Sequence, residues 1–147
     1  MKKQDYTKVM EWAVWANLDK NQDLELILLR GHLILELFID SLLENDGCKK
    51  YKNLSFYSKV NLLTNIADNK VVDFDSIKTY LLSINNLRNK FAHEWGFDIC
   101  ESEIEVWSKG VISAFEAEKF SKYTYRTIVI HAFSLLSGAL LEIQKKI

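Results

Sequence analysis

Residues 24–43, LELILLRGHLILELFIDSLL, decide the fold class of this chain. Thirteen of these twenty residues are apolar, as in a helix that buries most of its surface. A helix that spans a bilayer would carry the interrupting charged or ionisable side chains only at high cost. The stretch therefore predicts a buried helix of a soluble fold and no contact with a membrane. The interrupting residues are Glu25, Arg30, His32, Glu36 and Asp40.

The polar residues of this helix are regularly spaced. Glu25, His32, Glu36 and Asp40 are separated by seven, four and four positions. At about 100° per residue they form a stripe about 80° wide. We therefore expect the other faces to be covered, either at the centre of the fold or at an interface between copies of the chain. Asn21 is predicted to cap the helix, and Asp46-Gly47 to end it.

The composition agrees with a helical fold. The chain has 147 residues, 48% of them hydrophobic, with no proline and five glycines. So few turn-forming residues argue against a β-sandwich or barrel. We predict one all-α domain, residues 1–147, built as a bundle of about five principal helices. These are expected at residues 4–17, 21–45, 55–68, 73–93 and 124–145, with short helical turns at 103–109 and 115–122.

Charge and cysteine usage narrow the possible partners. Nineteen basic and twenty acidic residues give a net charge of −1, which excludes binding to nucleic acid by bulk charge. An RNA contact would need a local basic patch. Cys48 and Cys100 are too far apart for a CxxC unit, and the chain does not start with the apolar segment of a signal peptide. We therefore expect a cytoplasmic protein with reduced thiols.

One segment has the composition of such a patch. Residues 49–59, KKYKNLSFYSK, hold four lysines and three aromatic residues and no acid. Aromatic rings stack on bases while lysines contact phosphates, so the segment is a candidate RNA-binding site. The alternative is a solvated loop followed by a helix whose aromatic residues are core. The lysines concerned are Lys49, Lys50, Lys52 and Lys59.

The expected helix at 73–93 places an arginine on its apolar face. That face spans about 120° and includes Ile84 and Leu87, and Arg88 falls inside it. A buried guanidinium cannot lose its proton and needs acceptors. Glu36 or Asp40 is the predicted partner.

A polar line runs beside this arginine. Asn85, Asn89 and His93 follow one another at four-residue spacing along one flank of the same helix. With Arg88 they would place a guanidinium, an amide and an imidazole in one small volume, which could bind a phosphate and move a proton. The alternative is that Arg88 makes a structural ion pair and that His93 only ends the helix.

These residues resemble a known signature. Residues 87–93, LRNKFAH, have an arginine, a polar residue and then a histidine five positions after the arginine, which resembles the motif of the HEPN superfamily. Upstream, LRGHLILELFIDSLL and LSFYSKVNLL are similar to the preceding HEPN helices. FAHEWGFD and RTIVIHAFSLLSGALLEI resemble the mannitol-operon-repressor-like branch. The resemblance covers residues 24–145.

The resemblance implies a helical bundle that forms a homodimer, with two motif copies facing each other across a cleft. Many such domains are metal-independent endoribonucleases that act as toxins with an antitoxin partner or as effectors of phage defence. By resemblance, His93 would transfer the proton, Arg88 would stabilise phosphoryl charge and Asn89 would orient the group. Glu36, which the helical wheel places near Arg88, would support it, as would Asn85.

The same resemblance leaves a second function open. Members of the mannitol-repressor-like branch are transcriptional regulators, and some HEPN domains are non-catalytic modules that bind a protein or nucleic-acid partner.

No metal or cofactor is expected. His32 and Glu36 could form an HxxxE ligand pair, but no third or fourth ligand has suitable spacing. His32 and His131 are therefore interpreted as packing histidines.

Overall fold

The computed structural model describes residues 3–67, 74–99, 102–115 and 124–146, and within these ranges all regular structure is helical. The all-α prediction is confirmed, with six α-helices in place of the five expected. A 3-10 turn, η1, precedes α3. The elements are α1 (Lys3–Asp19), α2 (Leu24–Asn45), η1 (Tyr51–Asn53), α3 (Phe56–Ala67), α4 (Phe74–His93), α5 (Ile104–Ala114) and α6 (Tyr125–Lys146).

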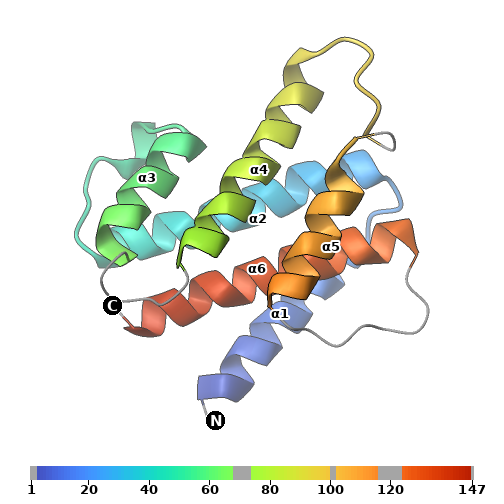
Figure 1. Cartoon of the computed structure of the whole chain (residues 1–147). Coiled ribbons are helices and arrows are strands. Elements are labelled where there is room, and N and C mark those ends of the chain that lie inside the picture. Colours follow the sequence, from blue (N-terminus) through green and yellow to red (C-terminus); the bar gives the residue numbers. More distant parts are fainter. Residues whose placement is uncertain (1–2, 68–73, 100–101, 116–123, 147) are drawn as a thin grey trace.

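The C-terminal helix α6 organises the packing, because it contacts α1, α2 and α5 (Figure 1). Its Phe133 is fully buried, and a Cβ atom added at Gly31 of α2 would lie only 2.6 Å from the Phe133 ring. Glycine at position 31 therefore lets α2 approach α6 closely. On its other flank α2 packs against α3 and α4, and α4 packs against α5.

The two ends of α2 have ordinary capping geometry. Asp23, not Asn21, caps α2, because its carboxylate accepts from the Glu25 backbone N–H at 3.1 Å. The predicted stop at Asp46-Gly47 is confirmed. Gly47 has φ +86°, and the Cys48 N–H donates to the Leu43 carbonyl, which is the Schellman pattern.

One face of α2 is both apolar and exposed to solvent. Leu26, Leu33 and Leu37 are 44%, 53% and 59% exposed, while His32 is buried. Of the polar stripe, His32 contacts Asn85 of α4, and Glu36 and Asp40 contact Lys59 of α3, while Glu25 is exposed. The leucine face of α2 is therefore not covered within one chain, and its place at an interface between copies of the chain stays a prediction.

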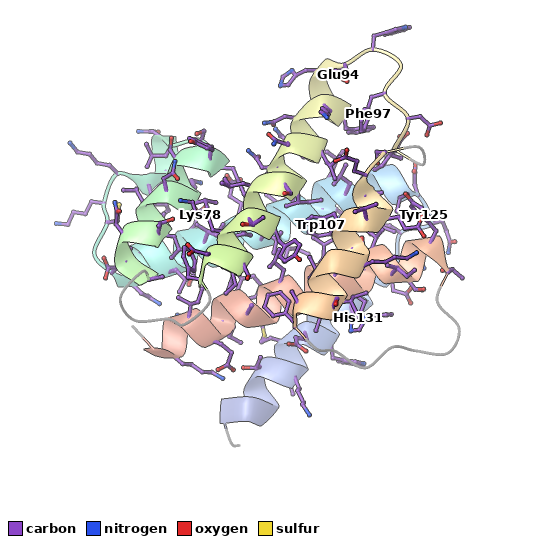
Figure 2. The ribbon with its side chains drawn as sticks, viewed as in Figure 1. Lys78, Glu94, Phe97, Trp107, Tyr125 and His131 are labelled. Atoms are coloured by element: carbon purple, nitrogen blue, oxygen red, sulfur yellow. The ribbon has the colours of Figure 1, made fainter. Side chains whose placement is uncertain are left out.

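The helix α5 is longer than the short turn predicted at 103–109. It packs on α4 and α6, and the Trp107 indole N–H donates to the Tyr80 carbonyl of α4 at 2.9 Å. The Trp107 and Phe133 ring centroids are 5.0 Å apart. Figure 2 shows Trp107 between α4 and α5. The predicted cap Asp73 and all of the predicted turn at 115–122 except Phe115 lie outside the described residues.

Among the described helices, α6 has the length and apolar composition of a membrane span over Tyr125–Lys145. About two thirds of that stretch, 67%, is buried inside the fold. The core helix of a bundle has the same composition, so this is weak evidence about a membrane.

Candidate functional site

The three residues of the predicted motif lie on the last two turns of α4. The helix ends at His93, and the Glu94 N–H still donates to the Lys90 carbonyl at 2.9 Å. Gly96, at φ +80°, then lets the chain reverse. Figure 1 shows this end of α4 extending beyond the other helices, and Figure 2 places Glu94 at its tip. The motif is therefore presented at an accessible end of the bundle.

Arg88 is half-buried and contacts its neighbour in the motif. Its Nη1 donates to Asn89 Oδ1 at 3.3 Å. No ion pair joins Arg88 to Glu36 or Asp40 in the described part of the chain, so the partners predicted for it are wrong. The guanidinium is left with hydrogen-bond donors that a phosphate could use.

Lys59 of α3 takes the place predicted for Arg88. Its ammonium lies 3.3 Å from Glu36 Oε2 and 2.8 Å from Asp40 Oδ1, and the side chain is 6% exposed. Burial lowers the pKa of Lys59, but the hydrogen bond to Asp40 and the charge of Glu36 outweigh burial, and the pKa is raised. Lys59 is a structural cation, and its predicted role in RNA binding is wrong.

The sequence does hold a signal for Lys59. Phe56, Val60 and Leu63 form the buried face of α3, and Lys59 falls among them at helical spacing. A lysine on a buried face needs acceptors for its ammonium group. The polar stripe of α2 supplies them.

Asn85 is also engaged elsewhere. It is buried, and its Oδ1 lies 3.0 Å from Nε2 of His32, whose ring centroid is 4.3 Å from that of Phe56. Burial lowers the pKa of His32, and the charge of Arg88 acts in the same direction, while the Asn85 bond and Glu36 oppose them. Asn85 thus joins the α2–α4 contact and does not extend the line formed by Asn89 and His93.

The exposed end of α4 therefore presents a smaller group than predicted. His93 is exposed one helical turn after Asn89, and Trp95 beside it is fully exposed. An arginine bonded to an amide, with an imidazole one turn away, has the donors to hold a phosphate and a group to transfer a proton. The accessible candidate set is Arg88, Asn89 and His93.

The remaining lysines of the predicted RNA segment form a separate surface. Lys49, Lys50 and Lys52 are exposed in the connection between α2 and α3, which we call the basic loop. Tyr51 within it is buried and donates to the Glu44 carboxylate at 3.3 Å, so it cannot stack on a base. The basic loop lies beside α3, away from the projecting end of α4 (Figure 1). A single chain does not bring the two surfaces together.

Histidines elsewhere are packed into the fold. His131 of α6 is buried, its ring centroid lies 5.4 Å from a ring of Trp15, and burial lowers its pKa. No cluster of three or more His, Cys, Asp or Glu side chains arranged for a metal ion occurs among the described residues.

No family model matches the sequence, and neither a curated protein nor a solved structure is significantly similar to the chain.

Proposed function

We propose that this chain is a HEPN-type, metal-independent endoribonuclease that acts as a cytoplasmic homodimer. The observation that supports this proposal most is which side chains bind Arg88. Lys59 binds Glu36 and Asp40, and Arg88 donates to Asn89 on the exposed end of α4. A guanidinium that has no carboxylate partner among the described residues, five positions before an exposed imidazole, suits a phosphodiester substrate.

The chemistry would use the 2′-hydroxyl of RNA. His93 accepts the proton of that hydroxyl, the 2′ oxygen attacks phosphorus, and the bond from phosphorus to the 5′ oxygen breaks. The products are a 2′,3′-cyclic phosphate and a 5′-hydroxyl, which takes up one proton. Arg88 stabilises the negative charge that develops on the phosphoryl oxygens, and Asn89 orients Arg88 through their hydrogen bond.

A dimer would complete this site. The reaction needs a base for the 2′-hydroxyl and an acid for the leaving oxygen, and the exposed end of one α4 carries a single histidine. If two motifs face each other, His93 of the partner subunit can supply the second proton transfer. RNA cleavage of this kind fits a toxin held by an antitoxin protein or an effector of defence against phage.

A second candidate function is a non-catalytic HEPN module of the mannitol-repressor-like kind, which regulates transcription through a protein or nucleic-acid partner. The full exposure of Trp95 favours it, because exposed tryptophans are enriched among the residues that dominate binding interfaces.

Purified protein incubated with RNA in EDTA separates the two functions. The enzyme is expected to cleave RNA. His93→Ala should abolish cleavage because it removes the group that accepts the 2′-hydroxyl proton. His93 is exposed, so the substitution leaves the packing of the fold intact. Glu94→Gln, at the next position and equally exposed, is the matched control and should cleave as the wild type does. Absence of cleavage, or cleavage that His93→Ala leaves unchanged, contradicts the ribonuclease proposal. RNA binding without cleavage supports the second function.

A further inference from the structure

The solvent-facing side of α2 carries exposed leucines together with charged residues. Between positions 26 and 43 the exposed side chains are three leucines and Arg30. The ridge continues through Asp40, which is 24% exposed, to the exposed Glu44. We call these six residues the leucine seam: Leu26, Arg30, Leu33, Leu37, Asp40 and Glu44.

The spacing of the leucine seam is that of a helix-pairing surface. Its members are separated by four, three, four, three and four positions, which is the alternation that keeps a stripe in line on one helix. The seam faces away from Gly31, where α2 packs on α6. The described part of the chain leaves each of these leucines about half exposed.

The leucine seam is complementary to a second copy of itself that runs in the opposite direction. The spacings are symmetric about position 35, so a second α2 running in the opposite direction places Leu33 opposite Leu37 of the partner subunit. The same register places Arg30 opposite Asp40 of the partner subunit, with Glu44 of the partner subunit one turn further along. The cation lies in the first half of the seam and the two carboxylates in the second half. Antiparallel pairing therefore joins opposite charges, whereas parallel pairing would align like charges.

We propose that the leucine seam is the surface through which two copies of this chain associate, with their α2 helices antiparallel and the two-fold axis near position 35. Two central leucine pairs are covered. At each end Arg30 approaches the carboxylates of Asp40 and Glu44 of the partner subunit, of which Asp40 also binds the partner subunit's Lys59. The proposal specifies the surface of the homodimer invoked above and rests on that self-association. It does not rest on the ribonuclease chemistry of α4.

Sedimentation velocity over a range of protein concentrations tests the surface. Leu33→Asp places a carboxylate in the apolar centre of the seam in each copy and should raise the dimer dissociation constant at least about tenfold. Val106→Asp is the matched control, because Val106 of α5 is an exposed apolar residue outside the seam. Arg30→Glu should also weaken the dimer about tenfold, while Lys20→Glu, the same charge change off the seam, should not. Circular dichroism verifies that each variant is folded.

Cross-linking tests the direction of pairing. With Cys48 and Cys100 replaced by serine, a mixture of the Leu33→Cys and Leu37→Cys proteins should be joined by a short bismaleimide faster than either protein alone. Faster linking within each protein alone indicates parallel helices and overturns the proposed register.

Two results overturn the surface itself. One is a chain that stays monomeric at every concentration, in which case the seam belongs to a different protein partner. The other is a dimer whose dissociation constant neither Leu33→Asp nor Arg30→Glu changes. A monomer would also leave the ribonuclease site without His93 of the partner subunit. A dimer that forms through another surface overturns only the seam, because RNA cleavage is measured separately through His93→Ala.

Discussion

Replacing Lys59 or Arg88 by methionine tests which of these two cations stabilises the fold. In Lys59→Met the apolar stem is kept and the ammonium is lost, so Glu36 and Asp40 remain together without their partner. Arg88→Met removes a guanidinium whose hydrogen bond is to the adjacent Asn89. The helical wheel of α4 alone would make Arg88 the structural residue, whereas the observed contacts make it Lys59.

The expected loss in the free energy of unfolding for Lys59→Met follows from the exposure of Glu36 and Asp40. Removing one partner of a fully buried ion pair costs about 3–5 kcal/mol. The Glu36 and Asp40 side chains keep 27% and 24% of their exposure, so water partly solvates the freed charges and we expect a loss of about 2 kcal/mol. For a domain of this size that is about 4–8 °C in Tm. Arg88→Met should change the free energy of unfolding by no more than about 0.5 kcal/mol, as is usual for residues outside such networks.

Urea unfolding followed by far-UV circular dichroism measures both variants under the same conditions. The wild type and the two variants should unfold with the same dependence on urea, so that the shift in midpoint reports stability alone. If Arg88→Met destabilises the chain as much as Lys59→Met does, Arg88 carries a structural ion pair. The proposal that its guanidinium is available for phosphate is then wrong.

Three further predictions concern packing, pH and RNA. Gly31→Ala should destabilise the chain by about 1–2 kcal/mol in thermal unfolding, because overpacking against the buried Phe133 outweighs the gain in helix propensity. Gly138→Ala should cost less, since the atoms that its Cβ would meet belong to a flexible glutamate side chain. The lowered pKa of His32 means that the unfolded chain binds more protons between the pKa of the folded chain and about 6.5. Over that window stability should fall as pH drops, by at most about 1.4 kcal/mol per pH unit, and it should fall less in His32→Gln. Replacing the three lysines of the basic loop by glutamine should weaken RNA binding and reduce its salt dependence, and unchanged binding would show that RNA does not reach this loop.

The helices themselves could be predicted from local sequence. Ser55 accepts from the Ser58 N–H at 3.2 Å as the expected cap of α3, and Gly47 and Gly96 stand where α2 and α4 are followed by positive φ angles. These are effects of neighbouring residues on the backbone, so a sequence pattern contains them. Asn21 was the wrong cap because Asp23 lies closer to the first turn and offers an equally good acceptor.

The partners of the polar side chains could not be predicted in the same way. A helical wheel places Arg88 on an apolar face, but it does not say which cation of a neighbouring helix lies nearest Glu36. The packing of α3 on α2 settles this in favour of Lys59. Similarly, the composition of residues 24–43 indicates a buried helix, yet the six helices of one chain leave Leu33 and Leu37 exposed. Both outcomes depend on how helices far apart in sequence meet.

The end groups of the RNA products show whether Arg88, Asn89 and His93 form a ribonuclease site. The wild type is incubated in EDTA with an RNA oligonucleotide and with the same sequence carrying 2′-O-methyl groups. We expect fragments that end in a 2′,3′-cyclic phosphate and begin with a 5′-hydroxyl, with no cleavage of the methylated strand and none by His93→Ala. Intact RNA, equal cleavage of the methylated strand, or fragments that begin with a 5′-phosphate would contradict the role assigned to Arg88, Asn89 and His93.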